Sequence, residues 1–115
     1  MKIISKSLEL SRDKYFEVHL AIINPVLPVQ LTEMEIKVLA AFMSLEGDIA
    51  QDRFGTTARK LVREKLNIKF AGLSNYISSL LKKGFIRQES NSYIIIPVVT
   101  PQDKEQHYQF KLSIK

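Results

Sequence analysis

The chain has 115 residues, of which 45% are hydrophobic and 25% charged, with no cysteine and a formal net charge of +5. This length predicts a single domain over residues 1–115 with a core of its own. The absence of cysteine excludes disulfides, thiol catalysis and cysteine-ligated zinc. No apolar run approaches the roughly 20 residues of a membrane span, and the first residues lack the apolar core of a secretory signal. We therefore expect a cytoplasmic protein that makes no membrane contact.

Basic residues are concentrated in the middle of the chain. Between Arg53 and Arg87, nine lysines and arginines stand against one acid, Glu64, so this stretch carries +8 and the remainder −3. Such segregation is typical of a surface that attracts nucleic acid. The alternative is that these side chains only solvate helix surfaces, and charge alone does not decide between the two.

Two helices are predicted in the first half of the chain. Apolar spacing favours a helix from Ser11 or Asp13 to about Ile23, although its β-branched residues leave a strand open. The next helix has the strongest start signal, a capping box with Thr32 at the N-cap and Glu35 three residues later. It is expected to end near Glu46-Gly47.

A helix-turn-helix is predicted next. Thr56 or Thr57 can cap a helix that runs to about Leu66, and a turn over residues 67–70 leads into another helix over about 71–83. Gly84 is well placed to end that helix, because glycine accepts the left-handed conformation found there. The helix-turn-helix core is therefore expected over about 31–84.

Strand signals follow the last helix. Phe85–Gln88 and Ser92–Ile96 flank turn-forming residues, which predicts a hairpin, the wing, over about 85–97. Alternation in the tail predicts an extra strand over about 106–114, and a short strand is also suggested near the N-terminus. The alternating residues of the tail are Tyr108, Phe110, Leu112 and Ile114, and those near the N-terminus are Leu8 and Leu10.

Taken together, these elements predict a mainly α protein of the α+β class. Three to four helices, a C-terminal β-hairpin wing and an additional C-terminal strand are the parts of a winged helix-turn-helix domain.

The segment from Leu66 to Ile86 resembles the recognition segment of MarR-type winged-helix regulators. In that family a Leu-x-Ile opens the turn, a helix of the form small-x-Ser-x-x-Ile/Leu-x-x-Leu follows, and Lys-Lys-Gly-x-Ile comes next. Leu31-Thr32-x-x-Glu35 is similar to the start of the family's second helix. The matching positions of the recognition segment are Leu66, Ile68, Ser74, Ile77, Leu80, Lys82, Lys83, Gly84 and Ile86.

This resemblance spans about Leu31 to Ile96 and implies a DNA-binding transcriptional regulator. It departs from the family at both ends, because MarR-type proteins dimerise through long terminal helices and this chain has only one such candidate, at its N-terminus. Phe70 also occupies a turn position that usually holds a small polar residue.

The recognition helix of a helix-turn-helix enters the major groove by its N-terminal part. Asn75 is the best candidate for a base contact, since asparagine can bond adenine at two atoms; the alternative is a solvated surface residue. The residues expected nearest the bases are Lys69, Phe70, Ser74, Asn75 and Ser78.

A second group is expected to contact phosphates, which sets affinity and register rather than sequence. Lys82 and Lys83 also suit the last turn of a helix for electrostatic reasons, and both roles can hold together. Arg87, on the wing, is expected to reach the minor groove or a phosphate. The remaining phosphate candidates are Arg59, Lys60 and Arg63.

Enzyme signals are missing from the sequence. His19 and His107 fall in no metal-ligand pattern, and the glycines form no phosphate loop. We therefore expect neither catalysis, nor a metal, nor a cofactor. The function predicted is binding of duplex DNA, most plausibly in transcriptional regulation. The alternative is a winged-helix module for protein–protein contact in a larger assembly, such as a phage-encoded one. A homodimer or a protein partner is expected to use the N-terminal helix or the C-terminal strand.

Overall fold

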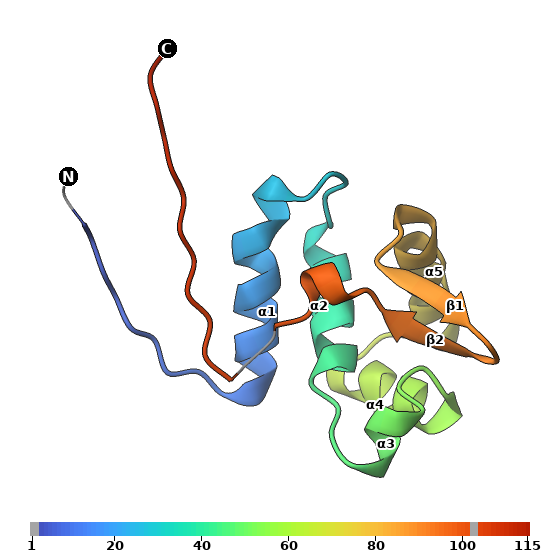
Figure 1. The fold of residues 1–115 in the computed structure, drawn as a ribbon. Coiled ribbons are helices and arrows are strands. Elements are labelled where there is room, and N and C mark those ends of the chain that lie inside the picture. Colours follow the sequence, from blue (N-terminus) through green and yellow to red (C-terminus); the bar gives the residue numbers. More distant parts are fainter. Residues whose placement is uncertain (1–2, 102–103) are drawn as a thin grey trace.

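The computed structural model describes residues 3–101 and 104–115, and within them five α-helices precede one antiparallel hairpin (Figure 1). The predicted α+β class is confirmed, with five helices in place of the three to four expected. Short 3₁₀ turns cover Asn24–Val26 and Pro97–Val99. The helices are α1 (Arg12–Ile23), α2 (Glu33–Met43), α3 (Asp48–Gln51), α4 (Thr56–Leu66) and α5 (Phe70–Lys83), and the strands are β1 (Ile86–Glu89) and β2 (Ser92–Ile95).

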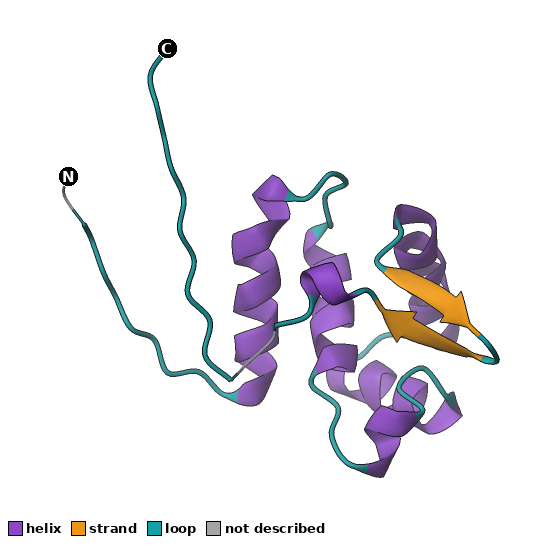
Figure 2. Cartoon of the chain, in the orientation of Figure 1, coloured by secondary structure: helices purple, strands orange, loops and turns teal. Residues whose placement is uncertain are grey.

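Helix α2 lies at the centre of the domain, with α1 on one side and α4, α5 and the hairpin on the other (Figure 2). Its residues Val38, Leu39 and Phe42 are fully buried, because a central helix is covered on more than one face. Every other layer contributes apolar side chains to the same core. The fully buried side chains outside α2 are Leu20 on α1, Val62 on α4, Leu73 and Leu80 on α5, and Ile86 and Val99 after α5.

The capping box at the start of α2 is confirmed. The Thr32 hydroxyl oxygen accepts a hydrogen bond from the backbone N–H of Glu35 at 3.2 Å, and the Thr32 N–H donates to Glu35 Oε1 at 2.7 Å. These two bonds satisfy backbone donors that the first turn of a helix leaves without partners.

The end of α2 comes earlier than predicted, at Met43 rather than near Glu46-Gly47. Arg53 accounts for this, since its Nη1 donates to the carbonyl oxygens of Phe42 at 2.7 Å and of Met43 and Leu45 at 3.2 Å each. These bonds supply donors to carbonyl oxygens that the end of a helix leaves without backbone partners. Helix α3 then forms a single turn between α2 and α4.

The two helices predicted to end at about Leu66 and to span about 71–83 are present as α4 and α5, with small shifts at the boundaries. Gly55, rather than Thr56 or Thr57, is the N-cap of α4, and α5 begins at Phe70 instead of 71. The turn between them contains Asn67, which has φ +53° and ends α4 in the left-handed conformation. Gly84 ends α5 as predicted, with φ +84°.

The hairpin follows α5 directly. Ile86 pairs with Ile95 and Glu89 with Ser92, which leaves a two-residue turn at Ser90-Asn91. Ser90 adopts φ +53°, as turns of this length require at their first central position. Only the inner residue, Ile86, is buried in β1, so the hairpin packs at its base and projects its tip into solvent.

The predicted terminal strands are wrong for the single chain. Residues 3–10, here called the N-arm, and residues 104–115, the C-arm, contain no strand in the part of the chain that the structure describes, and most of their side chains are exposed. Alternating apolar residues signal a strand with one face to bury, but a strand also needs a neighbouring edge for its backbone hydrogen bonds. The only sheet among the described residues is the β1–β2 hairpin, and neither arm joins it.

Candidate nucleic-acid interface

Helix α5 has one buried face and one open face. Leu73, Ile77 and Leu80 lie in the core. On the opposite side, Asn75, Ser78 and Lys82 succeed one another at intervals of three and four residues, and all three are exposed. We call these three residues the α5 stripe. Ser74 lies beside the stripe and is half-buried.

An aromatic ring and a guanidinium meet where α4 joins α5. Phe70 is the first residue of α5 and is 67% exposed, which is unusual for so large an apolar side chain. The guanidinium carbon of Arg63, from α4, lies 5.3 Å from the centroid of the Phe70 ring, in the range of a cation–π contact. Lys69, the N-cap of α5, is exposed beside them.

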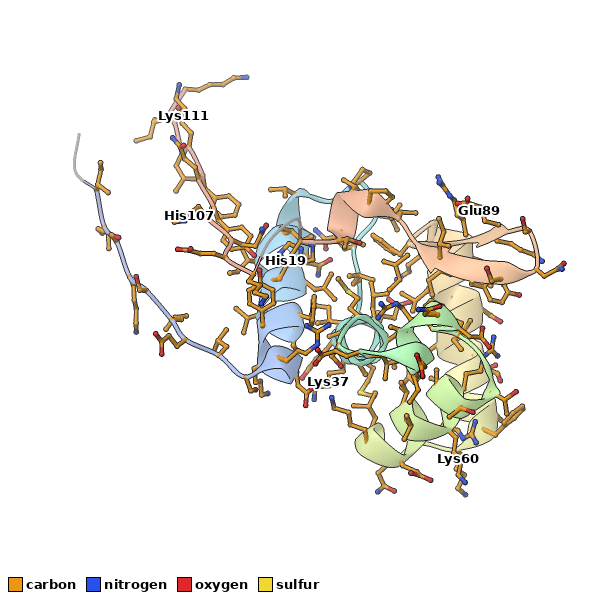
Figure 3. The ribbon with its side chains drawn as sticks, turned by 60° about the horizontal axis from the view of Figure 1, so that its bottom comes forward. His19, Lys37, Lys60, Glu89, His107 and Lys111 are labelled. Carbon is orange, nitrogen blue, oxygen red and sulfur yellow. The ribbon has the colours of Figure 1, made fainter. Side chains whose placement is uncertain are left out.

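The two remaining candidates on α4 differ in their surroundings. Arg59 is half-buried, and its Nε donates to the carbonyl oxygen of Phe54 at 2.6 Å, so it closes the start of its own helix. Lys60 is exposed and points away from the domain (Figure 3). Among the described residues, Lys60, Lys69 and Lys82 form no salt bridge.

Lys83 has a different environment from its neighbour Lys82. Its ammonium donates to Glu35 Oε1 at 2.6 Å and to the carbonyl oxygen of Gln30 at 3.0 Å. Ser79, one turn earlier on α5, donates to the other carboxylate oxygen of Glu35 at 2.5 Å. The side chain of Glu35 is only 3% exposed, so Lys83 neutralises a buried charge. The structure therefore gives Lys83 an internal role and leaves Lys82 as the outward-facing lysine of the pair.

The Glu35 carboxylate stays charged because of these bonds. Burial by itself raises the pKa of Glu35, but hydrogen bonds from Lys83, Ser79 and Thr32 outweigh it and lower the pKa from 4.5 to about 2. Removing Lys83 leaves the carboxylate of Glu35 buried without its cation, which is strongly destabilising, whereas the ammonium of Lys83 is 26% exposed and can be solvated.

Other cations of the basic stretch are also paired. The ammonium of Lys65 lies 2.5 Å from the carboxylate of Asp13 on α1. The guanidinium of Arg87 lies 3.1 Å from the carboxylate of Glu89 on the hairpin, and the side chains of Arg87 and Glu89 are both more than half exposed. Arg53 is turned toward the end of α2. The charge of the stretch is thus less available than the sequence suggested, and its unpaired part is concentrated around α5.

The sequence carried a signal for the inward position of Glu35. Glu35, Leu39 and Phe42 fall on one face of α2 by their spacing, and both apolar residues are buried. The capping box predicted for Glu35 is confirmed, and the structure adds that its side chain is buried. Ser79 was not singled out, because a serine on a helix gives no indication of its partner.

No known protein family, curated protein or solved structure matches the chain. Within residues 3–101 and 104–115, no group of three histidines or acidic residues is arranged to hold a metal ion. No helix in the same ranges is long and apolar enough to cross a bilayer.

Glu35→Gln tests the buried ion pair. Because the folded-state pKa of Glu35 lies below the unfolded value, its contribution is complete above pH 4.5 and is lost as the pH falls toward 2. We expect the wild type to lose about 3 kcal/mol of unfolding free energy over that interval through this group, and the variant to lack this loss. Urea unfolding at several pH values measures it. Glu33→Gln, an exposed neighbour, is the control, and an equal change in both variants would contradict the assignment.

Proposed function

We propose that the chain is a winged-helix protein that binds duplex DNA, with α5 in the major groove and the hairpin as the wing. The observation that carries the proposal is the α5 stripe, an open polar face with a lysine at its end on the second helix of a helix-turn-helix pair. A helix of this kind fits the major groove, whose width admits one α-helix. The proposed role is transcriptional regulation and involves no catalysis.

The proposed contacts divide by chemistry. Asn75 and Ser78, in the middle of the stripe, carry hydrogen-bonding groups suited to base edges, with Ser74 beside them. Lys69 and Lys82 lie at the two ends of α5 and Lys60 lies on α4; none has an acidic partner among the described residues, and we assign these lysines to phosphates. The guanidinium of Arg63 packs against the ring of Phe70. Arg87 contacts the duplex only if its ion pair with Glu89 breaks, and an exposed pair of this kind contributes little stability.

The alternative is a winged-helix module that binds another protein. The observation that favours it is the apolar character of the two arms, which lie away from α5. An absence of any duplex binding at low salt would favour this alternative over the proposal.

The phosphate contacts are tested by titrating a fluorescent random-sequence duplex at several salt concentrations. The logarithm of the affinity is expected to fall linearly with the logarithm of the salt concentration. Replacing Lys60, Lys69 and Lys82 by glutamine should flatten this slope by about 2 to 3 units, at roughly 0.9 per phosphate contact. The matched control replaces Lys6, Lys104 and Lys115, which are exposed on the two arms and likewise form no salt bridge among the described residues. Equal effects of the two triple changes would show that binding follows net charge and would contradict the proposed surface.

Asn75→Ala tests direct readout. On the preferred site, found by selection from random duplexes, the variant should lose about 1–3 kcal/mol of binding free energy, while binding to random duplexes should change little. Anisotropy titrations on both duplexes measure the difference. An equal loss on both would assign Asn75 to the backbone instead.

Phe70 is expected to contact the methyl group of a thymine, the apolar feature of the major groove. Replacing thymine by uracil in the preferred site removes that methyl and should weaken wild-type binding about fourfold at the contacted position, from ~0.8 kcal/mol per buried carbon. Phe70→Ala should bind both duplexes equally. A uracil effect that persists in Phe70→Ala would assign the methyl contact to another residue.

A further inference from the structure

The two arms carry most of the exposed large hydrophobic residues of the described chain. Of thirteen exposed large hydrophobic residues, eight lie on the N-arm or the C-arm. A soluble monomer scatters such residues singly, and a contiguous set marks an interaction surface. The eight residues are Ile3, Ile4, Leu8 and Leu10 on the N-arm and Tyr108, Phe110, Leu112 and Ile114 on the C-arm, with exposures from 36% to 101%.

The C-arm has the pattern of a strand without a partner. Its apolar residues occupy every even position from Tyr108 to Ile114, and the intervening residues are polar, with Lys111 at the centre. On the N-arm, Leu8 and Leu10 alternate in the same way with Ser7 and Glu9. Period-two alternation describes a strand that buries one face, yet neither arm is paired in the single chain.

The base of the C-arm is attached to α1. Tyr108 and His19 form a hydrogen bond at 2.6 Å between the tyrosine hydroxyl and Nδ1, and His19 Nε2 lies 2.9 Å from the carbonyl oxygen of Val99. Since a carbonyl only accepts, Nε2 carries the proton, and in neutral His19 Nδ1 accepts from Tyr108. Burial lowers the pKa of His19, which favours this neutral form. The attachment places the C-arm beside α1.

Helix α1 offers a second apolar surface on its outer side. Tyr15, Val18 and Ile22 follow at helical spacing, are half-buried and do not belong to the core around α2. Both arms extend from this side of the domain, away from α5 and the hairpin (Figures 1 and 3). The apolar residues of the arms and of the outer side of α1 therefore lie on the same side of the domain.

We propose that a second copy of this chain covers this surface, with the arms of the two copies pairing as an intermolecular β-sheet over the outer sides of both α1 helices. An extended arm adds backbone hydrogen bonds to another strand edge, which is a common mode of association. The surface is large enough, since eight side chains at roughly 100 Å² each approach the ~800 Å² per partner of a stable interface.

A two-fold axis suits the C-arm. Antiparallel pairing of the arm with its own copy about Leu112 sets Phe110 opposite Ile114 and Lys111 opposite Ser113, so no like charges face each other. All apolar residues then fall on one face of the pair, as burial against α1 requires. The same surface patch serves both copies, which is the commonest form of homodimer.

The mass of the full chain in solution, measured by light scattering after gel filtration, tests the proposal. We expect a mass near twice the 13.2 kDa of the single chain. The double variant Leu112→Asp/Ile114→Asp should run as a monomer with an unchanged helical circular dichroism signal. Val98→Asp, at an exposed valine outside the arms, should remain dimeric. A monomeric wild type at ~100 μM, or a dimer unaffected by the double variant, would overturn the proposal.

Cysteine substitution gives a second readout, because the chain has no cysteine of its own. Under mild oxidation, Leu112→Cys should form a covalent dimer, since residues opposite each other in a sheet lie within reach of a disulfide. Val98→Cys should not. Absence of cross-linking at position 112, the one residue that lies opposite its own copy in this register, would also overturn the pairing of the C-arms about Leu112. This test uses no DNA, so its outcome is independent of the proposed function.

Discussion

Glu35 joins the centre of the domain to the candidate recognition helix. Its carboxylate closes the first turn of α2 through Thr32 and accepts hydrogen bonds from Ser79 and Lys83 of α5. Because Ser79 and Lys83 lie one turn apart on α5, two contacts to the same buried group fix the rotation of that helix about its axis. With that rotation set, Leu73, Ile77 and Leu80 face the core and the α5 stripe faces outward. The contacts to Glu35 and the buried apolar face of α5 therefore orient the candidate interface together.

The same constraint separates charges that serve the fold from charges that remain available for binding. Lys83, Lys65 and Arg53 connect parts of the domain, through Glu35, Asp13 and the carbonyls at the end of α2 respectively. Within the basic stretch, Lys60 of α4 and Lys69 and Lys82 of α5 have no acidic partner among the described residues, and the apolar arms lie on the other side of the domain, near α1. Two surfaces with different chemistry are thus held apart by α2.

Local signals in the sequence predicted most of the elements. The capping box, the left-handed glycine after α5 and the turn-forming residues of the hairpin each act through neighbouring backbone atoms, so the sequence alone locates them. Features that depend on distant contacts were not predictable in this way. Arg53 ends α2 from ten residues away, and Lys83 finds Glu35 across 48 residues of chain. The prediction of a C-terminal strand was wrong for a related reason. Alternation of apolar and polar residues indicates which face of a strand is buried, but not which neighbouring strand completes the sheet. At the candidate site, the exposed positions of Lys60, Asn75, Ser78 and Lys82 follow from helical periodicity, whereas the exposure of Phe70 beside Arg63 depends on how α4 meets α5.

The central claim is that the open face of α5 contacts the duplex. The most direct measurement is a map of backbone amide chemical shifts in the full chain as a random-sequence duplex is added at low salt. The account predicts shifts concentrated on Asn75, Ser78 and Lys82 and on the start of α5, with little change on α1 or the arms. Shifts confined to the arms and the outer side of α1, or no shifts at a duplex excess, would contradict it.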